Sequence, residues 1–316
     1  MKKQVAGLAA ALCLVAGGAQ AQERISFVVP FSPGGPTDQV TRLIANELMK
    51  STGKTYIVEN KPGAAGIIAA QYVAQGPADG SVYMVGSPAS LVINKGLYKK
   101  LPYDPETDFV PVSGLTRSPL VLVANENVKA NTASAFVQDV KGGNEPAKMG
   151  SPGSGTIPHL AGSYFSNQVG IELLHVPYKG IAPAIAGLMA GDIDIVFDTL
   201  STSMANIQAG KIKALGVASS KRYDVIADVP TLAEQGHPVE ASSWFGLVAP
   251  AATPDNIVQA MNADINKIID APDFKQRLLE MGSEPLTGSP AEFARFIQQE
   301  RERWLPEVSR LELSAD

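Results

Sequence analysis

Cysteine and histidine are both scarce in this chain. Of its 316 residues one is a cysteine, Cys13, and three are histidines: His159, His175 and His237. A single cysteine cannot close a disulfide within the chain, and these histidines lack the spacing of a metal site. The composition therefore predicts a protein without disulfides, without a bound metal and without a cofactor.

An excess of basic residues is also missing. Lys and Arg number 26 against 31 Asp and Glu, which leaves a net charge of −5 at pH 7. This balance argues against nucleic acid as a partner. Hydrophobic residues make up 45% of the chain, enough to exclude a wholly disordered protein, and the length predicts about two domains.

Residues 1–21 have the pattern of a cleavable signal peptide. A basic start is followed by an apolar run and then by Ala-Gln-Ala at 19–21, the small-x-small cleavage signal. Cys13 raises the alternative of a lipoprotein signal, but Leu12 before it is larger than the residue such a site prefers. No later stretch is apolar for long enough to cross a membrane. We therefore expect export to the periplasm.

Strands and helices alternate in two separate regions of the remaining chain. In the first region, strands at 24–30, 55–59 and 81–85 alternate with a helix from Thr37 and an Ala-rich helix that ends near Ala74. In the second region, the expected strands are 147–150, 173–177, 194–197 and 212–218, and the expected helices are 157–168, 182–190 and 203–209. Such βαβ units require parallel sheets with right-handed crossovers. Two units of similar size predict two lobes.

The C-terminal part of the chain forms no βαβ unit of its own. It has one expected strand and two expected helices, at 244–249, 254–271 and 290–304, and Pro306 is expected to disturb the end of the last helix. We expect these elements to return to the first lobe. The predicted lobes are 22–123 with 242–316, and 124–241, with crossovers near 120–125 and 241–244 that form a hinge.

The most informative segment is Pro-Phe-Ser-Pro-Gly-Gly-Pro-Thr-Asp at 30–38. It follows a parallel strand and begins a helix, and open α/β sheets bind ligands at that edge. The free N–H groups and the dipole at a helix start favour an anion, and two glycines let a carboxylate approach the backbone. A tight turn with Thr37 or Asp38 as the helix cap is the alternative interpretation.

Loops of small polar residues recur at equivalent places in both regions. One contains Ser87 and Ser90, and another runs from 151 to 156. The sequence has no phosphate-binding loop, no complete G-x-G-x-x-G pattern, no G-x-S-x-G elbow and no H-E-x-x-H motif. Many polar donors without a nucleophile–base pair favour binding over catalysis, so no catalytic residue is predicted.

Six segments, in this order, resemble one known family. They are VPFSPGGPTD at 29–38, VENKPGAAG at 58–66, PADG at 77–80, VPYKG at 176–180, AGDID at 190–194 and VPTL at 229–232. The chain resembles the extracytoplasmic solute receptors of tripartite tricarboxylate transporters, the Bug family. The resemblance implies a type II-like periplasmic-binding-protein fold, in which two lobes of mostly parallel sheet flanked by helices are joined by two crossover strands.

The same resemblance implies a function, partners and a site. The receptor would be a monomer that closes on a small carboxylated solute, such as a di- or tricarboxylate, an acidic amino acid or an aromatic carboxylate. It would deliver this solute to one large and one small integral membrane subunit. The implied ligand-binding residues are Phe31, Ser32, Gly34, Gly35, Thr37, Asp38, Ser87 and Ser90 in the first lobe, and Ser154, Thr156, Tyr178 and Asp198 in the second.

Several of these side chains also have structural interpretations. Asp38 is interpreted as a helix cap in preference to a ligand contact, because a carboxylate repels an anionic solute. Asp198 has two interpretations: it caps a helix, or it accepts a hydrogen bond from a hydroxyl or amino group of the ligand. His159 is expected at the solvated surface and His175 at a structural position. Lys179 has two interpretations: it neutralises a second carboxylate of the solute, or it is a solvated surface side chain.

Two alternative functions remain open at this stage. A ligand sensor that feeds a two-component signalling system would have the same sequence features. A secreted hydrolase or transferase would use Ser154 with His159, but no acidic residue is evident to orient the histidine.

Overall fold

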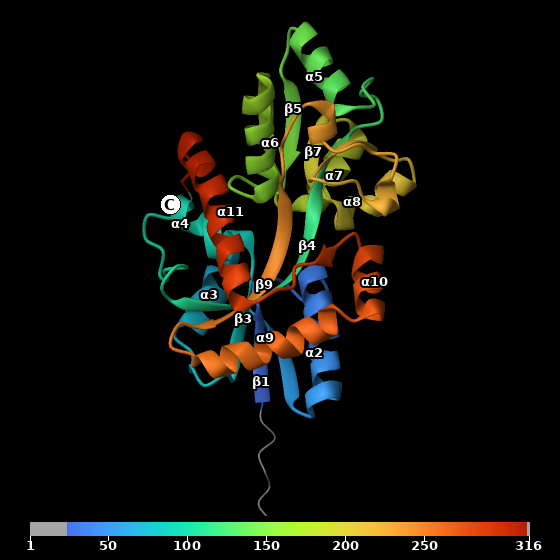
Figure 1. Ribbon diagram of the computed structural model, residues 1–316. Coiled ribbons are helices and arrows are strands. Elements are labelled where there is room, and N and C mark those ends of the chain that lie inside the picture. The colour runs from blue at the N-terminus through green and yellow to red at the C-terminus, as the bar shows by residue number, and fades with distance from the viewer. Residues whose placement is uncertain (1–23, 315–316) are drawn as a thin grey trace, which may run out of the picture.

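The computed structural model of this protein describes residues 24–314 (Figure 1). The predicted signal peptide and Cys13 lie outside the described residues. Within the described part, ten strands form one sheet, whose main order is β2-β1-β3-β9-β4-β7-β5-β6, with β10 and β8 both paired to β4. The sheet is parallel at its two ends and antiparallel in the middle, and this arrangement separates two lobes.

The first lobe is built on three parallel strands, as predicted. These are β1 (Arg24–Val29), β2 (Thr55–Asn60) and β3 (Val82–Gly86), and β1 lies between the other two. The connections are α2 (Pro36–Thr52), a short 3₁₀ turn (Ala64–Gly66) with α3 (Ile67–Ala74), and, after β3, a π-helix (Ala89–Ile93) with α4 (Asn94–Leu97). Helix α2 packs beside β2 and α3 beside β3.

The second lobe repeats this arrangement. Its parallel strands are β5 (Ala147–Ser151), β6 (Leu173–Pro177) and β7 (Ile195–Thr199), and β8 (Lys213–Ala218) pairs with β4. Its helices are α5 (Ala133–Gly142), α6 (Ile157–Val169), α7 (Ile181–Ala190) and α8 (Leu200–Gln208), followed by 3₁₀ turns at Asp224–Ile226 and Ala233–Gln235. The helices at 157–168 and 182–190 and the strand at 173–177 are confirmed within one residue. Helix α5 was not predicted.

One long strand belongs to both lobes. Strand β4 (Phe109–Ala124) pairs with β9 (Ser242–Pro250) as far as Pro119, and from Leu120 onward it pairs with β7 and β8. The Leu120 N–H donates to the Ala241 carbonyl oxygen (2.8 Å), so the two connections between the lobes run side by side. This is the two-lobed α/β fold of periplasmic binding proteins, which confirms the predicted fold class.

The C-terminal elements pack against strands and helices of the first lobe. Strand β9 pairs with β3, and α9 (Asp255–Ile269) packs against α2. The unpredicted α10 (Pro272–Glu280) and β10 (Glu284–Pro285) come next. The last helix, α11 (Pro290–Arg310), runs past Pro306, so the prediction of a disturbed end was wrong. Burial of Trp304 and Val308 on either side of Pro306 offsets the backbone hydrogen bond that proline removes.

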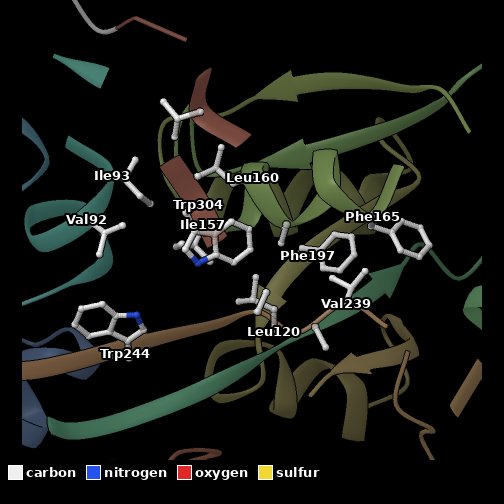
Figure 2. Packing of buried hydrophobic residues seen from close by; sticks show 14 of the residues in the cluster. Val92, Ile93, Leu120, Ile157, Leu160, Phe165, Phe197, Val239, Trp244 and Trp304 are labelled. Carbon is white, nitrogen blue, oxygen red and sulfur yellow. The ribbon is translucent and has the colours of Figure 1, made fainter. Parts of the chain in front are cut away.

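A single hydrophobic cluster crosses from one lobe to the other. Figure 2 shows members from both, from Val92 and Trp244 to Phe165 and Phe197. Trp244, at the start of β9, is completely buried in this cluster. Helix α11 contacts α6 of the second lobe. The lobes are therefore joined by apolar packing on one side as well as by the two strands.

Candidate ligand-binding site

The loop after β1 leaves the start of helix α2 open. Gly34 has φ +87°, a left-handed conformation that favours glycine, and Gly35 is the helix cap residue. No side chain caps α2, so the first-turn N–H groups, such as that of Thr37, have no partner within the helix. These donors and the helix dipole favour an anion at this loop, which makes it a candidate binding site.

Asp38 holds this loop in place. Its Oδ2 accepts the Gly34 N–H (2.9 Å) and Arg42 Nε (2.9 Å), and its Oδ1 accepts Asn60 Nδ2 (2.9 Å). Asp38 is buried, and the hydrogen bond from Arg42 is the largest of the effects that lower its pKa to about 2. The role of Asp38 is structural, but the prediction that it caps its own helix was wrong, because its carboxylate accepts the Gly34 amide and no amide of α2. The Gly34 N–H is accordingly already used, and Gly35, Thr37 and Asp38 are left as the backbone donors.

The other predicted residues of the first lobe lie beside this loop. Ser87 and Ser90 are buried at the end of β3, where the Ser87 N–H donates to Ser90 Oγ (3.0 Å). A Cβ atom on Gly66 would come within 3.3 Å of both Pro30 and Ser90, so three loops meet here. Phe31 and Ser32 are exposed on the same loop, and the Phe31 ring packs edge-on against Phe245 of β9 (centroids 6.0 Å apart).

The corresponding loop of the second lobe, Ser151–Thr156, is tied down by neutral groups. Thr156 Oγ1 donates to the Gly153 carbonyl oxygen (2.7 Å), and therefore does not cap α6, whose start has no side-chain cap. Ser154 is exposed. Helix α6 thus presents a second open N-terminus, which follows the carboxyl end of β5.

Two histidines pack behind this loop. His159 is 5% exposed and stacks on His175 with ring centroids 3.8 Å apart, so the predicted surface position of His159 was wrong. The cause is that His159, in the first turn of α6, faces β6 and not the solvent. The structural position predicted for His175 is confirmed, because its Nε2 hydrogen bonds Ser151 Oγ (2.6 Å).

Tyr178 and Lys179 follow β6 beside the same loop. The Tyr178 N–H donates to the Ser151 carbonyl oxygen (2.9 Å), and its ring packs over Gly187, where a Cβ would collide with the ring and its hydroxyl. Lys179 is exposed, so its side chain is solvated in this structure.

Asp198, at the end of β7, is satisfied within its own turn. Its carboxylate accepts the Thr199 N–H (2.7 Å) and the hydroxyls of Thr202 and Ser203. Burial raises the pKa of Asp198. These bonds favour a structural role for Asp198 beside the start of α8, although no side chain caps that helix, and ligand contact by Asp198 stays a prediction.

Sequence reasoning missed the partners that fix these loops. Arg42 and Asn60 lie far apart in the sequence, and only the pairing of β2 beside β1 brings Asn60 to Asp38. Ser118 on β4 was also missed; its Oγ donates to the Gly282 carbonyl oxygen (2.7 Å) and accepts the Ser201 N–H (3.3 Å). Two signals were available: Asn60 stood in the quoted VENKPGAAG segment, and Arg42 follows Asp38 at the i, i+4 spacing of a helical ion pair.

Neither a metal centre nor a membrane span is found in the part of the chain that the structure describes. No group of three or more His, Cys, Asp or Glu side chains among residues 24–314 is placed to hold a metal ion. No helix in that range combines the length and the apolarity needed to cross a bilayer. His159 Nδ1 accepts the Gly155 N–H (3.1 Å), so this nitrogen is already engaged by the backbone.

The fold and the open helix starts define a solute-binding protein of the periplasmic type. Residues 40–313 match the sequence model of the tripartite tricarboxylate transporter family receptor, and the chain belongs to that family. It is 34% identical to the UPF0065 protein in the tcbD-tcbE intergenic region of Pseudomonas sp. (strain P51), over all of this chain and 96% of that protein.

Two similar solved structures contain a named carboxylate. One is "R. palustris Rpa4515 with adipate", with 33% identity, a TM-score of 0.82 and coverage of 92% of this chain and 97% of that one. The other is MatC (Rpa3494) from Rhodopseudomonas palustris with bound malate, with 33% identity, a TM-score of 0.77 and coverage of 90% and 98%. These likenesses confirm the predicted family.

Proposed function

We propose that this protein is a periplasmic receptor that captures a small carboxylated solute between its lobes and delivers it to a tripartite transporter. The observation that carries the proposal is the uncapped start of α2, held in place by Asp38 through the Gly34 amide. Family membership and the adipate and malate in two relatives support the same class of solute.

The proposed grip uses backbone donors. One carboxylate would accept N–H groups of Gly35 and Thr37 at the start of α2, where the helix dipole adds positive potential. Asp38 does not oppose this, because its own charge is already compensated by Arg42 and Asn60. Hydroxyls of Ser32, Ser87 and Ser90 would complete this half of the site; the close packing of Gly66 against both Pro30 and Ser90 supports their place beside the loop.

The second lobe is proposed to hold the other end of the solute. Helix α6 also starts without a side-chain cap, and Ser154 and Thr156 stand just before it. Two uncapped helix starts in different lobes suit a solute with two separated carboxylates. Closure of the lobes, with the predicted boundaries 22–123 with 242–316 and 124–241, would exclude water and strengthen these hydrogen bonds.

The rest of the proposal concerns the receptor in the cell. Residues 1–21 would direct export to the periplasm, the mature protein would act as a monomer without catalysis, and one large and one small membrane subunit would receive the solute. Light scattering of the purified mature chain tests the monomer, and sequencing the N-terminus of the exported protein tests the cleavage.

A thermal-shift screen tests the central claim. The mature protein is heated with several dozen carboxylic acids, adipate and malate included, and with sugars and divalent metals as controls. A solute at about 100 times its dissociation constant should add about 2.7 kcal/mol to the free energy of unfolding. Shifts with sugars or metals but with none of the acids would overturn the proposal.

A further inference from the structure

Two stacked histidines hold both ends of the second-lobe loop. His159 Nδ1 accepts the N–H of Gly155 near the end of the loop (3.1 Å), and His175 Nε2 shares a hydrogen bond with Ser151 Oγ at its start (2.6 Å). Ser151 Oγ also accepts the Gly153 N–H (3.1 Å). The rings lie 3.8 Å apart and 12° from parallel.

This geometry requires His159 to be neutral. A ring nitrogen can accept an N–H only while it carries no proton, so His159 must be the tautomer protonated at Nε2. Protonation at Nδ1 would replace the hydrogen bond to Gly155 with two opposed N–H groups. Two cationic rings at this separation would also repel each other.

The surroundings do not favour a charged pair. Helix α6 and the Ser151–Thr156 loop contain no Asp, Glu, Lys or Arg, and β6 contributes only His175 itself. On β5, Lys148 is exposed, and on β7, Asp198 is bonded within its own turn. On α11, which also contacts α6, Arg310 bonds Ser163 one turn beyond His159 and is paired with Glu307. Burial is the main cause that lowers the pKa of His159 to about 4, and the nearby His175 adds to it. Burial also lowers the pKa of His175.

We propose that His159 and His175 are positioning residues for solute binding: the neutral stack fixes the Ser151–Thr156 loop, and protonation of the stack releases it. The inference rests on the proposed function, because the loop is taken to face the solute. His159 acts through the Gly155 amide and His175 through Ser151, and neither ring needs to touch the solute. Affinity for a carboxylate should then depend on whether the side chain at position 159 accepts the Gly155 N–H, and not on whether that side chain is an imidazole.

A first experiment needs no solute. The three histidines of the chain are followed by NMR of the labelled mature protein as the pH is lowered from 8 to 3.5, together with the backbone amide of Gly155. We expect His159 to titrate near pH 4 and the Gly155 amide to move with the same midpoint. An ordinary midpoint near 6.5 for His159, or a Gly155 amide that does not follow it, would overturn the inference.

A second experiment compares matched variants at pH 7.5, with adipate and malate as probes in calorimetry. In His159→Asn, the side-chain oxygen can sit where Nδ1 lies and accept the same N–H. His159→Leu fills the space but leaves that buried N–H without an acceptor. We expect His159→Asn to bind within about threefold of the wild type and His159→Leu to bind about tenfold more weakly.

His237 supplies the matched control for these variants. It contacts Ser134 and Phe165, away from the loop, so His237→Asn and His237→Leu should bind as the wild type does. Equal affinities for His159→Asn and His159→Leu would contradict a positioning role. If the wild type binds no carboxylate at all, the proposed function fails while the NMR titration still decides the role of the stack. If His159→Leu does not fold, the NMR titration likewise decides the role of the stack.

Discussion

The two lobes fix equivalent loops by opposite means. In the first lobe, an ionised carboxylate, Asp38, gathers the Gly34 amide, Arg42 and Asn60. In the second lobe, the loop is fixed by uncharged groups: the His159 ring accepts the Gly155 amide, and the His175 ring hydrogen bonds the Ser151 hydroxyl. Both arrangements leave a helix start without a side-chain cap. A backbone site can thus be oriented either by a charge that is compensated internally or by groups that stay neutral.

Because one loop is fixed by a carboxylate and the other by neutral histidines, acid should destabilise the two lobes over different pH ranges. The larger loss of unfolding free energy is expected in the second lobe. The folded pKa of His159, about 4, lies below its unfolded value of 6.5, so the unfolded chain takes up the proton first. The wild type should therefore lose about 3 kcal/mol of unfolding free energy as the pH falls from 6.5 to 4. Urea denaturation at a series of pH values measures this loss.

His159→Asn provides the comparison for that series. Its stability should vary much less over the same pH interval, because the titrating ring is gone. For Asp38, lowered from 3.8 to about 2, the stabilisation is present above pH 3.8 and is lost only as the pH falls toward 2. An equally steep loss between pH 6.5 and 4 in His159→Asn would show that the two lobes do not differ in this way.

Removing the charge in the first lobe should have the next largest effect. Asp38→Asn breaks the pair with Arg42 and weakens the bond to the Gly34 amide, and we expect a loss of about 2 kcal/mol, since Arg42 is about half exposed. Affinity for adipate or malate should fall about a hundredfold by calorimetry, because the loop loses its anchor. Glu47→Gln, which breaks only the exposed Lys50 pair, is the control and should change stability by less than about 0.5 kcal/mol. Unchanged affinity in Asp38→Asn would rule out the anchoring role.

The adjacent glycines separate backbone strain from access to the site. Gly34→Ala should cost about 1 kcal/mol, because φ is +87° there although the space around it is open. Gly35 has φ −73° and a Cβ would meet only the Ser32 carbonyl oxygen at 3.8 Å, so Gly35→Ala should leave stability nearly unchanged. We expect Gly35→Ala to weaken carboxylate binding instead, since its Cβ stands beside the open donors. Melting curves and calorimetry of the two variants give both quantities.

An effect on stability no larger than that of Gly34→Ala is expected from one hydroxyl of the second lobe. Thr156→Val keeps the shape of the side chain and removes the bond to the Gly153 carbonyl oxygen, at a cost of about 1 kcal/mol in unfolding free energy. Binding should weaken by less than tenfold, because both histidines still hold the loop. A larger loss of affinity than in His159→Leu would reverse the proposed order of importance within this loop.

The predictable part of the structure is the part with strong local patterns. The β1–loop–α2 unit follows from a β-rich run, two glycines and apolar residues at helical spacing. Strand β4 was not predicted over 109–119, where prolines and a glycine interrupt the pattern. Its pairing with β9 is a contact between distant parts of the chain, which local propensity does not contain.

The position of the candidate site was predictable, but the residues that hold its loops in place were not. Glycines and small polar residues at strand ends mark where the loops lie. The burial of His159 was not predictable, because it depends on which face of α6 meets β6. Asn60 acquires its role only through the pairing of β2 beside β1, whereas Arg42 reaches Asp38 at the i, i+4 spacing of helix α2.

The buried carboxylate of Glu300 has a practical consequence. Glu300 Oε2 accepts the indole N–H of Trp244 on β9 (2.8 Å) and that of Trp304 on α11 (3.1 Å), and these are the two tryptophans of the chain. One indole sits on a strand that runs between the lobes, and the other sits where the last helix contacts α6. The proposed closure would move α6 against α11, next to Trp304. The intrinsic fluorescence of these two tryptophans would then follow closure without an added label.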